Sequence, residues 1–443
     1  MEFNHSEVFE KLLEPIDGMC QNNAYSRSCP RLEDESWIKV GLQRSLAELC
    51  TGRGFLIKLI IDGADYLSCS HYFESLKSER RLNHLLEVHK QLIIKEESTP
   101  DKSDPFLKFP ELASFDLYAG DGHYHEAPVH EIKVDNKVFA TQHFYALNLR
   151  SYMMSHLTLA EYGGDRKKEH DMRALKRMTI AELRKGAKKG QKVLYVWDKA
   201  GIDFKQWQKW KQQGGVYFLS EEKALNRLLV CGEPAFDKED PVNAGVLNYE
   251  SVASANGISF SRVTYQCPET GNIFKFLTNL PKTIRPGVIA QLYRSRWDIE
   301  RKYNVFKNKL FERKAWATTS TAKNMQAIFL CLAHNLTHIF GKAIESEVDV
   351  SKDDVEKQEA RSKESKKKAQ AAGREAAPHV FGPKRVTELP RKLFIWLRSW
   401  IFKVSPWKQA MENLKGLFRD KNHSKRGDWH APDSSRGGLI EKI

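Results

Sequence analysis

The order of strand-like and helix-like segments between residues 106 and 220 restricts the fold more than any other feature of the sequence. Three β-rich segments come first, and helical patterns then separate two short apolar runs. In chain order the segments are ASFDLYAGD, KVFATQHFYALNLR, SYMMSHLTLAEY, HDMRALKRMTIAELRKGA, QKVLYVWDKAG, DFKQWQKWKQQG and GVYFLS. This β-β-β-α-β-α-β order predicts an α/β fold with three antiparallel strands, followed by parallel strands joined through crossover helices.

Further strand-like segments follow at residues 221–285, among them ISFSRVTYQC and NIFKFLTNL. They separate the α/β pattern from a helical segment at 293–307, which reads YRSRWDIERKYNVFK. We therefore expect a β-rich insertion between the last parallel strand and this helix.

The helical segment at 293–307 has two faces of different chemistry. At about 100° per residue, four side chains point within an arc of roughly 60°; they are Tyr293, Arg296, Glu300 and Lys307. An apolar stripe beside them is suited to docking on a core and comprises Leu292, Ile299, Tyr303, Phe306 and Leu310. The carboxylate can hold a metal ion, and the other three groups suit a phosphate-rich ligand. A plain surface helix with an Arg296–Glu300 ion pair fits the same spacing.

The spacing Y-x2-R-x3-E-x6-K, with Trp297 after the arginine, resembles the signature of the IS4-family DDE transposases. By motif and element order the resemblance extends over roughly residues 65–340. It implies an RNase H-like catalytic core with a β-strand insertion at about 221–285. It also implies metal-dependent phosphodiester chemistry on DNA.

The resemblance assigns a set of three acids to this chain. RNase H-like enzymes place one acid on the first strand, one after the fourth strand and one on a later helix. Here these positions hold Asp121 in AGDG, Asp198 in VWDKAG, and Glu300. Such carboxylates hold two Mg²⁺ ions, for which Mn²⁺ can substitute, so these three are the expected catalytic and metal-binding residues. Lys199 and Ala200 stand where Arg and Gly are more usual in the family, a mild departure.

Neighbouring acids have plainer interpretations. Asp116 falls on the opposite face of its strand from Asp121, and only Asp121 precedes a glycine that allows close backbone approach. Asp203 is expected to cap the helix that begins after it. Asp298 is rotated well away from the face of Glu300 and is expected to be solvated.

The segment DGHYHEAPVHE offers a competing kind of site. Its His123, His125 and His130 could bind a transition metal together with Asp121. The H-x-H spacing is common by chance in a chain with 15 histidines, and polar surface or phosphate contacts explain these residues more simply. A zinc site is therefore the less favoured interpretation.

The resemblance also implies DNA contacts. Tyr293 and Arg296 would grip a phosphate near the cleaved end, and Lys307 would neutralise a further phosphate. Some relatives stack a flipped base on an aromatic residue of the insertion, and Phe274 is the nearest candidate here. Because Phe274 alternates with Phe276 in a predicted strand, a place in the core fits it at least as well.

The charge balance favours polyanionic partners. The 443-residue chain carries 71 Lys and Arg against 57 Asp and Glu, a net charge of +14, which indicates nucleic acid first and anionic membrane second. Seven scattered cysteines without a CxxC pair argue against a disulfide framework and fit a reducing cytoplasm. The family resemblance implies a bacterial cytoplasmic protein associated with the nucleoid. The apolar run at 327–340 includes Asn335 and two histidines, so we expect a buried helix there and no membrane span.

Four regions are expected along the chain. Residues 1–105 are mainly helical, and a DNA-binding domain and a plain helical cap are equally good interpretations. Residues 106–345 form the catalytic domain, and the charge-dense residues 346–383 form a flexible linker. Residues 384–443 form a basic helical region, whose amphipathic helix at 392–404 suits a protein partner or core contact better than a membrane surface.

These inferences together predict the transposase of a bacterial insertion sequence. It would bind terminal inverted repeats as a homodimer, cleave DNA at the element's ends with Mg²⁺, and join the freed 3′-hydroxyl to target DNA. Two alternatives stay open: another RNase H-like nuclease, such as a resolvase or repair enzyme, and a non-catalytic DNA-binding derivative of a transposase.

Overall fold

The computed structural model places most of the chain between Ser6 and Arg419. The residues it describes are 6–29, 32–47, 51–61, 68–98, 104–128, 130–131, 133, 136, 138–160, 171–223, 227–267, 270–296, 314–348, 360, 363–364, 367–373 and 388–419. Every structural statement below refers to these residues.

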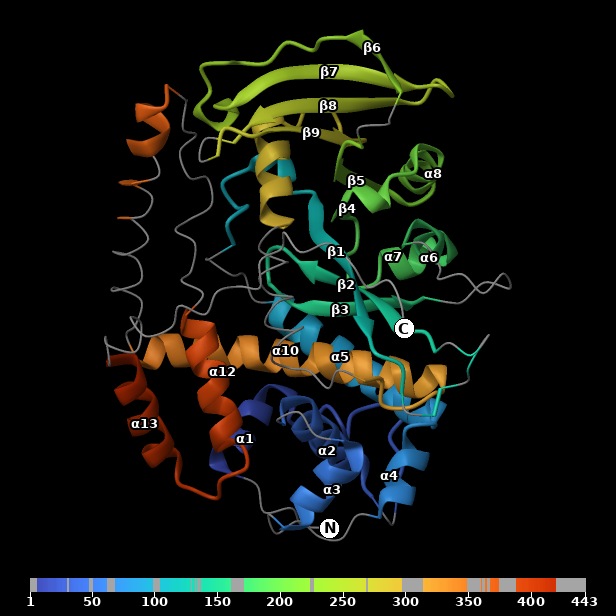
Figure 1. Ribbon diagram of the computed structural model, residues 1–443, viewed down its shortest axis with the longest axis vertical. Coiled ribbons are helices and arrows are strands. Elements are labelled where there is room, and N and C mark those ends of the chain that lie inside the picture. Colours follow the sequence, from blue (N-terminus) through green and yellow to red (C-terminus); the bar gives the residue numbers. More distant parts are fainter. Residues whose placement is uncertain are drawn as a thin grey trace.

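A nine-stranded mixed sheet runs through the upper part of the molecule (Figure 1). Its strands lie in the order β3-β2-β1-β4-β5-β9-β8-β7-β6. In chain order they are β1 Phe115–His125, β2 Thr141–Asn148, β3 Met154–Leu159, β4 Lys192–Trp197, β5 Val216–Glu221, β6 Leu228–Gly232, β7 Val246–Ser254, β8 Ser259–Gln266 and β9 Ile273–Thr278.

The first five strands form the expected α/β core. Strand β1 pairs antiparallel with β2, β2 pairs antiparallel with β3, and β1-β4-β5 are parallel neighbours. This strand order and polarity are those of an RNase H-like sheet, so the predicted arrangement of antiparallel strands followed by parallel ones is confirmed. The remaining strands, β6 to β9, form an antiparallel meander inside the predicted insertion, and β9 joins it to β5.

One face of the core sheet is covered by α6 Asp171–Arg177, α7 Ile180–Leu183 and α8 Phe204–Gly214 (Figure 1). Helix α8 begins where the Asp203 carboxylate accepts the backbone N–H of Gln206, and it ends at Gly215 with a positive φ of 60°. The capping role predicted for Asp203 is therefore confirmed. Two tryptophans three residues apart, Trp207 and Trp210, both stack on Phe218 and attach the helix to β5.

The opposite face of the sheet packs on a layer of helices. The long helix α10, Ser320–Val348, crosses this layer and contacts β3 and three N-terminal helices, α1 Glu7–Leu13, α2 Asp34–Leu46 and α5 Glu79–Ser98 (Figure 1). Two further N-terminal helices are α3 Gly52–Ile61 and α4 Cys69–Ser75. Residues of α1, α2, α5, α10 and the odd-numbered positions of β1 share one continuous hydrophobic core. The N-terminal helices thus cover α10, and their suggested DNA binding stays a prediction.

Helix α10 is the part of the described chain with the composition of a membrane span. Its segment Ser320–Ile344 is long and apolar enough, but 72% of the most apolar stretch is buried inside the protein. Within it the buried Asn335 accepts the backbone N–H of Met154 at 2.7 Å and donates to the carbonyl of the same residue at 3.1 Å. The helix is therefore an internal core element hydrogen-bonded to strand β3, as the interrupted apolar run predicted.

The amphipathic C-terminal helix also packs inside the molecule. Helices α12 Glu388–Trp400 and α13 Trp407–Arg419 lie against α1 and α10 (Figure 1). Trp396 of α12 is buried and stacks on Phe340 of α10, with 6.2 Å between ring centroids. The Ser6 hydroxyl donates to the carbonyl of Ile401, which joins the two ends of the described chain. Of the roles considered for this helix, a core contact is the one observed.

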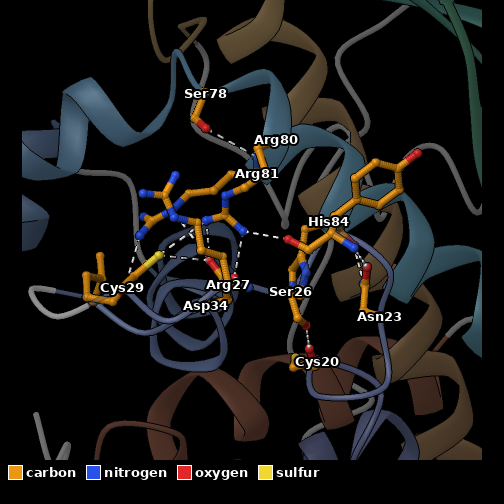
Figure 2. A network of polar contacts seen from close by, with 12 residues as sticks. Cys20, Asn23, Ser26, Arg27, Cys29, Asp34, Ser78, Arg80, Arg81 and His84 are labelled. Atoms are coloured by element: carbon orange, nitrogen blue, oxygen red, sulfur yellow. Dashed lines mark hydrogen bonds and ion pairs between the residues drawn. The ribbon is translucent and has the colours of Figure 1, made fainter.

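A charged network fixes the loop between α1 and α2 to the start of α5 (Figure 2). The Arg80 guanidinium donates to both oxygens of Asp34, each at 2.7 Å, and Arg81 donates to the carbonyl of Leu32. Burial alone would raise the pKa of the Asp34 carboxyl, but its hydrogen bonds to Arg80 outweigh that and lower it. This bidentate pair sets the position of α2 against α5, and both helices pack on α10.

Several imidazoles lie buried between the sheet and the helical layer. His125 of β1, His143 of β2 and His89 of α5 are each at most 5% exposed, and Nδ1 of His143 lies 3.0 Å from Nε2 of His156. Burial lowers the pKa of His89 to about 4 and that of His156 to about 3. Burial also lowers the pKa values of His125 and His143 well below the usual range. All four are therefore neutral in the folded protein at pH 7.

Because these histidines are buried and neutral, we expect the fold to lose stability in acid at a higher pH than the one at which carboxylates titrate. A pKa lower in the folded state than in the unfolded state means that unfolding takes up a proton once the pH falls below about 6.5. Each such histidine then reduces the free energy of unfolding by about 1.4 kcal/mol per pH unit. Urea denaturation should show a steep loss of stability as the pH falls from about 6.5, the usual pKa of histidine in an unfolded chain, to about 5. Exchanging the exposed His71 for Gln is the control and should leave the slope unchanged. A flat profile over this interval would contradict the buried neutral state.

Candidate active site

The pairing register of strands β1 and β4 places two of the expected acids, Asp121 and Asp198, on neighbouring strands. In the parallel pair of β1 and β4, Ala119 lies opposite Val196, so the same register carried two residues further sets Asp121 opposite Asp198. Adjacent strands lie about 4.8 Å apart, and a shift of two residues preserves the face. Both carboxylates therefore project from the sheet face that packs on the helical layer, at the carboxyl end of β4. Asp116 projects from the other face, as predicted, and accepts the backbone N–H of Lys188 at 2.8 Å.

The backbone around both acids is tightly constrained. A Cβ on Gly120 would lie 2.4 Å from the Trp197 ring, so this position before Asp121 requires glycine. An Asp121 carboxylate oxygen accepts the N–H of Gly122 at 2.8 Å. The carbonyl of Asp198 accepts the Ser220 hydroxyl at 2.7 Å and the N–H of Gly201 at 3.1 Å. Asp121 does not end its strand, because β1 continues in its pairing with β2 to His125, whereas β4 ends one residue before Asp198.

Glu221 is a third acid at this edge, and it was not among the site residues predicted from the sequence. Trp197 pairs with Ser220 in the parallel ladder of β4 and β5, so Glu221 continues the row of Asp121 and Asp198 on the same face. Its carboxylate lies 2.7 Å from the Lys199 ammonium and accepts the Tyr293 hydroxyl at 3.4 Å. The sequence does place an acidic residue at the end of the last parallel strand, as it does for Asp198. Glu221 was missed because the predicted strand ended at Ser220.

The helix at 286–296 brings the aromatic and cationic residues to this row of acids. Tyr293 packs on Phe276 of β9 with 4.5 Å between ring centroids, and the Arg296 guanidinium lies 5.3 Å from the Tyr293 ring centre. Burial raises the pKa of Tyr293 to about 12, against an opposing effect of Arg296, and the charges of Glu221 and Asp198 raise it further. Tyr293 thus lies near Glu221 and Asp198, and Arg296 lies against Tyr293, while the role of both in DNA binding stays a prediction.

The expected exposure of this helix face is not found. Tyr293 is 1% exposed and Arg296 is 9% exposed, so neither side chain opens onto solvent. The prediction assigned only the Leu292 stripe to the core, whereas Leu292 and Tyr293 are both buried. The physical reason is that Phe276 of strand β9 packs on the Tyr293 ring, and the Tyr293 hydroxyl donates a hydrogen bond to Glu221. The one polar atom of the side chain therefore has a partner, and the ring can be buried.

Glu300 and Lys307 lie outside the described residues, as do Trp297 and Asp298. Phe274 is half-buried in β9 and stacks on Phe276, with 6.1 Å between ring centroids and 6° between ring planes. It also packs against the larger core. A core role accounts for this placement, and base stacking by Phe274 stays a prediction.

The donor set at this edge suits a hard cation. Asp121, Asp198 and Glu221 offer only oxygen atoms, which are the ligands that Mg²⁺ prefers. Within the described ranges, no three His, Cys, Asp or Glu side chains are close enough together to hold a metal ion by themselves. The transition-metal site considered for His123, His125 and His130 with Asp121 is therefore not formed, because His125 is buried beside Gln326 of α10. Magnesium binding at this edge therefore stays a prediction.

A comparison with protein families agrees with this geometry. Residues 141–336 match the family model described as the transposase DDE domain. The match extends from β2 into α10 and includes Asp198, Glu221 and Tyr293, whereas Asp121 precedes it. No curated protein matches the sequence. The match supports a DDE transposase family for this chain.

The packing of Tyr293 gives a prediction about stability. Replacing Tyr293 by Ala should lower the free energy of unfolding by about 3–5 kcal/mol, because a buried ring beside Phe276 is lost. Replacing it by Phe removes only the hydroxyl and its bond to Glu221, so a loss of about 1 kcal/mol is expected. Urea denaturation of the two variants measures the difference. Equal stabilities for the Ala variant and the parent would show that the ring is not a core element.

Proposed function

We propose that this protein is a DNA transposase of the IS4 type that cleaves DNA at the ends of its element and joins those ends to a target. One observation carries the proposal. The parallel ladder of β1 and β4, carried two residues beyond Ala119 and Val196, sets Asp121 opposite Asp198 on one face of the sheet, within a chain that matches the transposase DDE domain. Tyr293 of the signature lies near Asp198, and Arg296 lies against the Tyr293 ring.

Asp121, Asp198 and Glu300 would hold two Mg²⁺ ions, which supply an activated nucleophile and stabilise the leaving oxygen. The residues of this chain set the geometry. Register sets the two aspartates opposite each other, and the helix that begins at Pro286 brings Tyr293 to the same edge. In the first step water attacks the phosphorus, the P–O3′ bond breaks, and a free 3′-hydroxyl remains. In the second step this hydroxyl attacks a phosphorus of target DNA and displaces a target 3′-oxygen.

Substrate contacts belong to the same proposal. Lys199 is half-exposed at this edge and follows Asp198 directly, so it is a ready phosphate contact. Tyr293, Arg296, Lys307 and Phe274 would add contacts to the backbone and bases. Because Tyr293 and Arg296 are buried in the free protein, their contact with a phosphate requires DNA to uncover them. The terminal inverted repeats and target DNA would be held by a homodimer.

Substitution of one aligned acid tests the chemistry. Asp198→Asn keeps the size of the side chain but removes its charge, so Mg²⁺-dependent cleavage of an end-bearing duplex should fall by about 10³-fold or more. Binding of the same duplex, measured by fluorescence anisotropy, should persist. Glu300→Gln should behave in the same way.

Asp203→Asn is the matched control, since Asp203 lies five positions further and caps α8. Because Asn caps a helix about as well as Asp does, this variant should fold and should retain cleavage. Cleavage that survives Asp198→Asn at the parental rate would exclude this site as the catalytic centre.

Another RNase H-like nuclease is the second candidate, because the alignment of Asp121 and Asp198 serves any enzyme of that class. A joining assay with a pre-cleaved end separates the two. A transposase links the 3′-hydroxyl to target DNA, whereas a resolvase or repair nuclease cleaves without joining. A non-catalytic derivative would show neither activity in Mg²⁺.

A further inference from the structure

We propose that the loop between α7 and β4, residues 184–192, is a second DNA-backbone contact, separate from the row of acids. This basic loop reads RKGAKKGQK. The segment from 171 to 192 carries eight Lys and Arg against two acids, close to half of the net charge of +14 within 22 residues. Such a concentration of like charge is self-repulsive unless a polyanion binds it.

Several lysines outside the basic loop are ion-paired, and Lys176, Lys199 and Lys323 each have a carboxylate within 2.7 Å. Three exposed lysines of the basic loop form no ion pair with any described carboxylate. These are Lys188, Lys189 and Lys192. Lys185 differs from them, because burial lowers the pKa of its ammonium group and the charges of Glu182 and Glu87 act on it.

The nearby carboxylates are already engaged. Glu182 forms a capping box with Thr179, and Glu87 pairs with Lys90 at 3.2 Å. Asp116 accepts the backbone N–H of Lys188 and not its ammonium group. Lys192 lies near a further cation, Lys211 of α8. Burial lowers the pKa of Lys211, and the charge of Lys192 lowers it further, so the two ammonium groups are close together. The positive surface therefore extends from the loop onto α8.

The loop backbone is held in place, and Lys188, Lys189 and Lys192 are exposed on it. The Arg184 guanidinium donates to the carbonyl of Gly214 at 2.6 Å and to that of Gln191 at 2.7 Å, so it braces both ends of the loop. Gly186 and Gly190 turn the chain with φ values of 88° and 84°. An added Cβ at Gly190 would meet no atom within 4 Å, which leaves space above the loop for a ligand. A pre-arranged backbone lowers the ordering cost of binding.

Its position sets the basic loop apart from the row of acids. The loop precedes β4, and Asp198 follows it, so six residues of extended chain, about 20 Å, separate the two sites. A duplex bound at the loop is thus a different segment from the phosphodiester beside Asp198. The loop contains only one apolar side chain, Ala187, so it has nothing to insert into a bilayer. This composition favours a nucleic-acid backbone over an anionic membrane.

The test compares two triple variants of the full chain. Lys188→Ala, Lys189→Ala and Lys192→Ala remove three loop charges, and Lys238→Ala, Lys367→Ala and Lys408→Ala remove three exposed lysines elsewhere. Affinity for a random-sequence duplex of about 40 base pairs is measured over a series of salt concentrations. The loop variant should bind roughly tenfold more weakly at low salt, with a log–log salt slope shallower by about 3. The control should match the parent.

Two outcomes would overturn the proposal. One is a loop variant whose affinity and salt slope equal those of the control. The other is unchanged duplex binding together with lost binding to phosphatidylserine vesicles, which would assign the loop to a membrane. The inference does not depend on catalysis. At saturating DNA the loop variant should cleave at the parental rate if the proposed function is correct, whereas a failure of the proposed function would leave the binding result unaffected. Circular dichroism checks that both variants fold.

Discussion

The in-register pairing of three parallel strands is the constraint on which the rest of this structure depends. Hydrogen bonds between β1 and β4, and between β4 and β5, set each strand end relative to its neighbour. Because the side-chain period of a strand is two residues, a slip of one residue in either ladder would move a carboxylate to the wrong face. Asp121, Asp198 and Glu221 share a face and an edge only through this register.

The insertion and the following helix complete that edge. Strand β9 pairs with β5 and returns the chain to the helix at 286–296. At its start the N–H of Gly287 donates to Asn243 at 2.9 Å, and a Cβ on Gly287 would lie 1.9 Å from the carbonyl oxygen of Val242. The Arg285 guanidinium pairs with Glu111 at 2.7 Å and with Asp240 at 3.0 Å. The helix is therefore fixed to both the insertion and the core before it reaches Tyr293.

The helical layer stabilises the same face from the other side. Helix α10 packs on β3, α2 and α5, and its Asn335 bonds to the backbone of Met154. The buried histidines lie in this interface and are satisfied only in part, which places much of the pH sensitivity of the fold beside the sheet. The terminal helices α1 and α12 close the layer through Ser6 and Ile401. The row of acids is thus supported by elements from both ends of the described chain.

The sequence by itself determined the element order, the opposite faces of Asp116 and Asp121, the cap at Asp203 and the buried character of α10. These follow from local periodicity, strand parity and capping chemistry, all of which act over a few residues. The domain boundaries and the roles of Glu300, Lys307 and Phe274 stay predictions. Only the tertiary structure decided that Glu221 joins the acids, that Tyr293 is a core residue, and that the C-terminal helix packs on α10. Each of these depends on contacts between segments far apart in the chain, such as β5 with β9 and Phe340 with Trp396, and no local pattern encodes such a contact.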